Sequence, residues 1–136
     1  MGLRFIGFVA SGAAFLGLDA AWLSYAAGRI YRPRLGALLR EDFAVLPAAA
    51  FYVVYIAGIL VFAVGPALAS GRWTTAVWRG AALGFLAYAT YDLTNQATLR
   101  NWSSFVSVID MAWGTMLTAA AALAGYAAMQ AVLSRA

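Results

Sequence analysis

The sequence contains the pattern Asp-x-x-Trp twice, as Asp19 and Trp22 in LDAAWL and as Asp110 and Trp113 in IDMAWG. Residues three apart lie on the same face of an α-helix, so each pattern places a carboxylate one turn from an indole ring. A carboxylate beside aromatic rings suits an organic cation. The repetition predicts two equivalent halves of one pocket. The plainer interpretation is that the tryptophans only anchor helix ends at a membrane interface.

A second polar group lies in the stretch YDLTNQATLRNW, where Asp92 and Asn95 continue a helical stripe that includes Tyr88. These two side chains belong to the same predicted pocket, or they only cap a helix end and satisfy backbone groups at a turn. The candidate ligand-binding residues are the members of both groups: Asp19, Trp22, Asp92, Asn95, Asp110 and Trp113.

The composition places these residues in a membrane. Of the 136 residues 65% are hydrophobic and 10% are charged, whereas about a quarter of an average soluble domain is charged. A helix needs about 20 apolar residues to cross the hydrocarbon region. Four segments meet that length, and they lie roughly at residues 5–27, 47–69, 75–94 and 105–133. We therefore expect one all-α domain over residues 1–136, a bundle of four transmembrane helices.

The segment between the first two spans, RIYRPRLGALLREDFAVLP, is too charged to cross. Its leucines recur at helical spacing, Pro33 suits a helix start and Pro47 suits a helix end. This pattern predicts a short amphipathic helix that lies in the interface, with its arginines toward lipid headgroups. An ordinary amphipathic connector is the alternative.

Small residues four apart occur along the spans, and such spacing lets helices approach closely. The pairs are Gly7 and Ser11, Gly80 and Gly84, Gly114 and Thr118, and Ala121 and Gly125. The partner helix belongs either to the same chain or to another copy in a homo-oligomer.

Antiparallel threading of four spans brings the end of the first, the end of the third and the start of the fourth to one membrane face. Asp19, Asp92 and Asp110 therefore fall in the same leaflet. Ionisable groups inside a membrane are costly and usually line a cavity or a pathway. The alternative for Asp19 is a structural ion pair with Arg29 or Arg100.

The residue types that are missing limit the chemistry. The chain has no Cys and no His, which excludes disulfides, thiolate chemistry and a His general base, and we expect no cofactor and no resident metal. The nine basic residues are all arginines and the net charge is only +4, so we expect membrane lipids rather than nucleic acid as partners.

The elements YDLTN and VIDMAWGT, together with LDAAWL and the second-span run FYVVYIAGILVFAVGPAL, closely resemble a family of small bacterial four-span inner-membrane proteins. It is the domain-of-unknown-function family 2177, and the resemblance covers nearly the whole chain. It implies a multi-pass protein of the bacterial inner membrane with four helices. It implies no activity and no catalytic residues.

Three functions remain open at this stage. The first is binding or transport of a small ligand, either an organic cation or a proton or metal ion carried by carboxylate and amide oxygens. The second is a membrane enzyme acting on a lipid-like substrate, with Asp19 and Asp110 as the catalytic acid and base. The third is a structural subunit of a larger membrane complex, in which the small-residue faces contact another protein.

Overall fold

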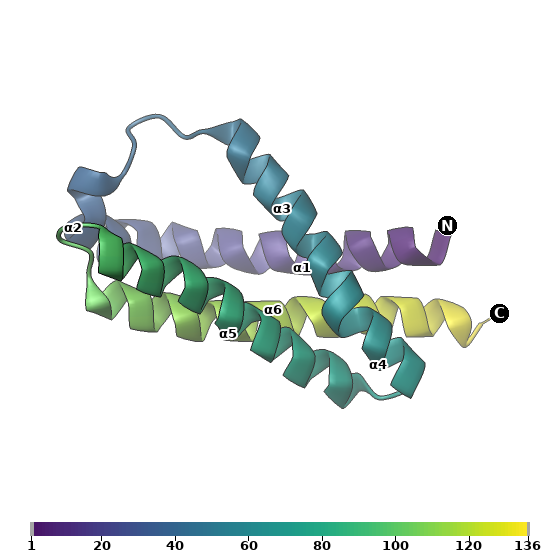
Figure 1. Cartoon of the computed structure of the whole chain (residues 1–136). Helices are drawn as coiled ribbons and strands as arrows, with labels where there is room; N and C mark the ends of the chain where they lie inside the picture. Colours follow the sequence, from purple (N-terminus) through teal and green to yellow (C-terminus); the bar gives the residue numbers. More distant parts are fainter. Residues whose placement is uncertain (1, 136) are drawn as a thin grey trace.

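The structure is a computed structural model that describes residues 2–135, and within that range it consists of helices and connecting turns without a strand. The first unit comprises α1 (Gly2–Ala26), a π-helical turn η1 (Ala27–Tyr31), α2 (Arg32–Leu35) and a 3-10 turn η2 (Gly36–Leu38). The second comprises α3 (Val45–Ile59), a π-helical turn η3 (Leu60–Val64) and α4 (Gly65–Ser70). The last two are α5 (Trp73–Thr98) and α6 (Ser104–Leu133). The predicted all-α bundle of four long helical units is confirmed (Figure 1).

Within the described residues, three helical units are long and apolar enough to cross a membrane, namely Gly2–Leu38, Val45–Ser70 and Ser104–Leu133. The remaining long helix, α5, has 26 residues and extends about 39 Å at 1.5 Å per residue. It is less apolar than the other units because Arg79 and the polar side chains near its C-terminal end interrupt it. One of these polar residues, Asp92, is fully buried inside the bundle.

The short helix predicted between the first two spans corresponds to α2 and η2, and Pro33 lies in its first turn as expected. The helix ends at Leu38, well before Pro47, so the predicted C-terminal half of this helix is wrong. Leu39 adopts an extended backbone conformation, and the guanidinium of Arg40 turns back to Asp42 at 3.0 Å. Residues 39–44 form a loop instead of a helix.

The centre of the bundle is closed by fully buried apolar side chains from three helices, Phe15 of α1, Ile59 of α3 and Leu117 of α6. The ring of Phe15 meets the ring of Tyr55 edge-on, with their centroids 5.3 Å apart. The hydroxyl group of Tyr55 in turn lies 2.8 Å from Oγ1 of Thr118. This layer ties α1, α3 and α6 together at mid-height.

The small residues pack against one another within this chain. A Cβ atom on Gly84 of α5 would collide with the carbonyl oxygen of Gly114 and with Thr118, both on α6. A Cβ on Gly125 of α6 would likewise collide with Oγ of Ser11 on α1. The close approach that the sequence predicted therefore joins α6 to α5 and to α1.

The N-terminal half of α3 leaves the bundle. The turn η3 and α4 contact α5 extensively, but α3 itself makes almost no contact with α5. Figure 1 shows α3 slanting away from α5 toward its N-terminal end. Large apolar side chains such as Leu46 and Val54 are exposed there, as expected for a helix face in contact with lipid. The bundle is thus closed at the level of η3. Between η3 and the N-terminal end of α3, it is open between α3 and α5.

The glycine contacts predict a stability difference between two otherwise similar substitutions. We expect Gly84→Ala to lower the free energy of unfolding by about 1–3 kcal/mol because its methyl group overpacks the α5–α6 interface. Gly58→Ala is the matched control, because a Cβ atom on Gly58 meets nothing within 4 Å. The substitution raises the helix propensity by the same amount as Gly84→Ala. Thermal unfolding in mild detergent measures both. Equal stability of the two variants would show that this interface is looser than described.

Candidate ligand-binding site in the membrane

Asp19, about two turns before the end of α1, accepts hydrogen bonds from two other helices. Trp113 of α6 donates its indole Nε1–H to Oδ1 at 3.3 Å. Tyr52 of α3 donates its hydroxyl to Oδ2 at 3.2 Å. Both oxygens are therefore held, and the carboxylate links α1, α3 and α6.

Asp110, in the second turn of α6, is held by a different chain of donors. Tyr31 donates its hydroxyl to Oδ1 of Asp110. The hydroxyl oxygen of Tyr31 accepts a hydrogen bond from Nε1 of Trp22 at 2.9 Å. The indole of Trp22 therefore supports the carboxylate of Asp110 through the tyrosine.

The two Asp-x-x-Trp motifs interlock crosswise. The indoles of Trp22 and Trp113 stack, with ring centroids 4.8 Å apart and an interplanar angle of 15°. The antiparallel packing of α1 on α6 sets Asp19 level with Trp113 and Asp110 level with Trp22, so each tryptophan serves the aspartate of the other motif. The sequence predicted that the motifs meet, and this exchange of partners is the geometry by which they do so.

Tyr31 was missed by sequence reasoning because of the π-helical turn η1. Residues nine apart lie on opposite faces of a regular α-helix, at about 100° per residue. The wider turn over Ala27–Tyr31 holds more residues and so rotates Tyr31 back toward the face of Trp22. The sequence did contain a signal for Tyr52, because antiparallel threading places the start of the second span in the leaflet of Asp19.

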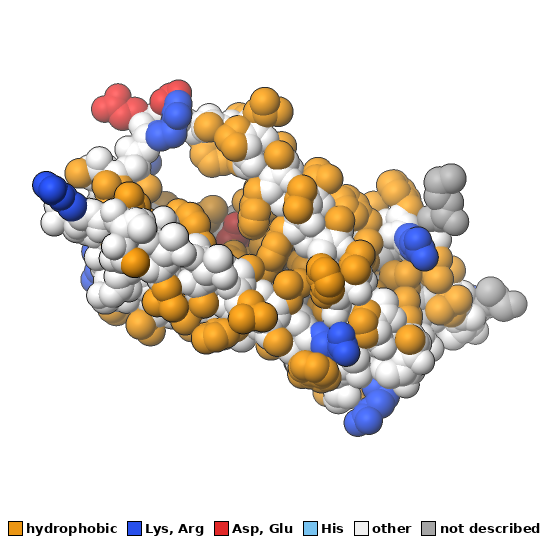
Figure 2. Space-filling model, viewed as in Figure 1, with side chains coloured by type: hydrophobic (Ala, Val, Ile, Leu, Met, Phe, Trp, Pro, Cys, Tyr) orange, Lys and Arg blue, Asp and Glu red, His pale blue; other side chains and the backbone are white. Residues whose placement is uncertain are grey.

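The two carboxylates line one cavity of about 430 Å³, which we call the acidic chamber. Its walls include the two interlocked motifs with Tyr31 and Tyr88, and residues Arg32, Leu39 and Phe43 line the side near the loop. Figure 2 shows a hollow between the loop, α3 and α5, with an acidic side chain at its depth. The volume falls in the range of roughly 300–1,000 Å³ that is usual for small-molecule sites.

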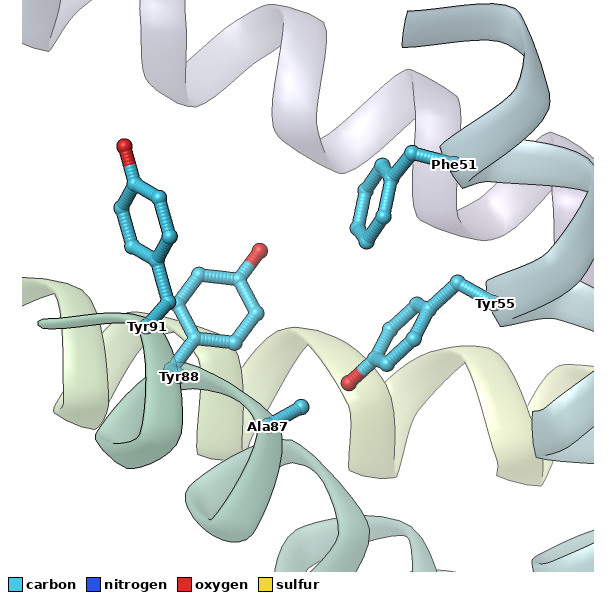
Figure 3. A pocket seen from close by; sticks show the side chains of 5 residues that line it. All are labelled: Phe51, Tyr55, Ala87, Tyr88 and Tyr91. Carbon is cyan, nitrogen blue, oxygen red and sulfur yellow. The ribbon is translucent and has the colours of Figure 1, made fainter. Parts of the chain in front are cut away.

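A second cavity of about 290 Å³, the aromatic slot, lies in the wedge between α3 and α5. It is lined by Phe51 and Tyr55 from α3 and by Ala87, Tyr88 and Tyr91 from α5. Figure 3 shows the two sets of rings facing each other across the gap. Because Tyr88 and Tyr91 also line the acidic chamber, the two cavities adjoin. Together they offer a polar end and an apolar end.

Residues 4–127 match the family described as "Predicted membrane protein (DUF2177)". The chain belongs to this family. The match includes every residue of the acidic chamber and of the aromatic slot. No curated protein and no solved structure matches the chain.

In this member of the DUF2177 family, Asp92 lies apart from the other two aspartates. It is fully buried on α5 and does not line the chamber or the slot, and neither carboxylate oxygen has a hydrogen-bond partner among the described residues. The hydrogen bond from Gln96 to Ser104 at 2.8 Å sets the register of α5 on α6 nearby, so Asp92, four residues before Gln96, lies level with the second turn of α6. Since α5 continues to Thr98, Asp92 is not a terminal cap.

Asn95 lies one turn beyond Asp92, is half-buried and does not line either cavity. Its backbone carbonyl accepts a hydrogen bond from the N–H of Leu99 at 2.8 Å, which closes the end of α5. The structure therefore brings four of the six predicted ligand-binding residues into the acidic chamber and leaves Asp92 and Asn95 outside it.

The aspartates of the chamber are held by neutral donors. Within residues 2–135 the ion pair that forms is between Arg40 and Asp42. Arg29 lies over the ring of Tyr25, with its guanidinium carbon 4.5 Å from the ring centroid. Asp19 therefore does not form the structural ion pair considered as an alternative. No group of three or more acidic side chains in this range is arranged to hold a metal ion. The chamber presents carboxylate oxygens with no counter-charge in contact.

The crosswise arrangement predicts a pattern of energetic coupling. In a double-mutant cycle on unfolding, Trp113→Phe and Asp19→Asn should couple by about 0.5–3 kcal/mol because they share a hydrogen bond. Trp22→Phe and Asp19→Asn should couple by less than about 0.5 kcal/mol, although they belong to the same motif. Denaturant unfolding of the single and double variants measures both. The reverse ranking would mean that each tryptophan serves its own motif.

Proposed function

We propose that the protein binds an amphiphilic ligand whose cationic amine reaches Asp19 and Asp110 and whose apolar part lies in the aromatic slot. The observation that carries the proposal is the continuity of the two cavities through Tyr88 and Tyr91. One end of this space offers two carboxylates without a basic partner in contact, and the other end opens between helices that face lipid. A ligand of matching polarity enters from the bilayer.

The chemistry of the chamber favours an amine. A carboxylate oxygen has two lone pairs, so Asp19 and Asp110 keep acceptor capacity after their contacts with Trp113, Tyr52 and Tyr31. An ammonium group donates to both and offsets their charge, and charge-assisted hydrogen bonds of this kind are among the strong ones. Low-dielectric surroundings strengthen the attraction further.

The packing below the chamber supports binding from one leaflet rather than passage across the membrane. Phe15, Ile59 and Leu117 are fully buried beneath the chamber, and α6 contacts α5 and α1 through glycines. Transport would require this layer to open. We therefore favour ligand binding over transport as the function.

A ligand series tests the proposal. We expect dodecylamine to bind the purified protein in decyl maltoside micelles with at least about tenfold higher affinity than dodecanol, because only the amine pairs with the carboxylates. Asp19→Asn and Asp110→Asn should each remove most of this preference. The change in tryptophan fluorescence reports binding, since Trp22 and Trp113 line the chamber.

Asp42→Asn is the matched control, because it makes the same change in net charge at an exposed loop position. It should leave the preference for the amine intact. Equal affinity for the amine and the alcohol, or equal loss in all three variants, would rule the proposal out.

An aspartate-based lipid enzyme is a second candidate, favoured by the unequal surroundings of the two carboxylates in one chamber. Asp19 accepts from Trp113 and Tyr52, whereas Asp110 accepts from Tyr31. Different surroundings allow one carboxyl group to act as acid and the other as base. If this candidate is right, protein incubated with a bacterial lipid extract should yield a new lipid by mass spectrometry, and Asp110→Asn should not. Unchanged lipids with active, folded protein would count against it.

A further inference from the structure

We infer that the ligand is a zwitterionic lipid of the phosphoethanolamine type, with its amine at Asp19 and Asp110 and its phosphate at Arg32. This inference rests on the proposed function and adds the anionic half of the headgroup. It starts from the one basic side chain among the residues that line the acidic chamber.

Arg32 lies where the chamber meets the surface. It lines the acidic chamber and also the broad concavity of about 860 Å³ beneath the loop of residues 39–44. Its side chain is exposed, and within residues 2–135 it forms no ion pair. Asp42 of the loop pairs with Arg40 at 3.0 Å. The guanidinium of Arg32 is therefore open to an anion from outside the protein.

The groups around this space match one headgroup class. Carboxylates line the chamber, Arg32 lines it where it meets the concavity beneath the loop, and the aromatic slot adjoins it at Tyr88 and Tyr91. A ligand that contacts all three carries an amine, a phosphate and an apolar chain. The planar guanidinium binds phosphate oxygens in pairs, and an arginine beside a membrane commonly meets lipid phosphate.

The stacked indoles favour a primary amine over a quaternary one. Recognition of a quaternary ammonium uses open aromatic faces around the cation. Here Trp22 and Trp113 each cover one face of the other at a centroid distance of 4.8 Å and direct their N–H groups to Tyr31 and Asp19. The carboxylate oxygens remain as charged acceptors for the cation, and they need N–H donors. Ethanolamine has these donors and choline lacks them.

The experiment compares four probes in decyl maltoside micelles: dodecylphosphoethanolamine, dodecylphosphocholine, dodecylamine and free O-phosphoethanolamine. We expect dodecylphosphoethanolamine to bind about tenfold more tightly than dodecylamine, because the phosphate adds a charge-assisted contact. It should also bind more tightly than the choline and chain-free probes. In Arg32→Gln the ratio of the phosphoethanolamine to the amine affinity should fall to one or below.

Arg34→Gln is the matched control. Arg34 carries the same charge two residues away, but it lies over the ring of Phe105, 4.4 Å from its centroid, and does not line the chamber. It should keep the wild-type ratio. The phosphate assignment is overturned if the wild-type protein binds dodecylphosphoethanolamine and dodecylamine equally, or if the ratio of these affinities falls equally in Arg32→Gln and Arg34→Gln. Equal binding of the choline probe overturns the primary amine, and equal binding of O-phosphoethanolamine replaces the lipid by a soluble ligand. Failure of dodecylamine to bind would instead defeat the proposed function itself.

Discussion

The structure depends on the hydrogen bonding of two half-buried carboxylates, Asp19 and Asp110, inside the helix bundle. A polar group buried without partners costs several kcal/mol in such surroundings, and a charge costs more. The protein meets this requirement with indole and phenol donors from Trp22, Tyr31, Tyr52 and Trp113. Each donor side chain also contributes a large apolar surface, so one residue fills space and satisfies an oxygen. The helices must keep the positions that these contacts require.

The positions of the other helices follow from that requirement. The stacked indoles fix α1 against α6, and the contacts of Gly84 with Gly114 and Thr118 fix α5 against α6. The helix α3 is held at η3, by Tyr55 and Ile59 in the central layer and by the contact of Tyr52 with Asp19, whereas its N-terminal end before Tyr52 is mostly exposed. The aromatic slot lies where α3 separates from α5. This separation between α3 and α5 suits entry of the proposed ligand from the side.

The sequence predicted the four long helices and the meeting of the two Asp-x-x-Trp motifs, because helix order and helical spacing are enough to place Asp19 and Asp110 at one end of the bundle. It could not predict the exchange of partners, which depends on the register of α1 on α6. Tyr31 escaped because a π-helical turn has no periodic pattern in the residues themselves. Asp92 directly follows Tyr91, which lines the chamber, so rotation about the axis of α5 rather than position along it keeps Asp92 outside. Depth in the membrane follows from sequence more readily than rotation about a helix axis.

The attachment of α3 has a mechanical consequence. The N-terminal end of α3, before Tyr52, is mostly exposed, so the rest of the protein offers little resistance to its displacement. In a bilayer the opposing force comes from the lateral pressure of the surrounding acyl chains. For the proposed ligand, the width of the entrance between α3 and α5 then depends both on the protein and on how tightly the surrounding lipids are packed, so that the fluidity of the membrane affects access to the carboxylates.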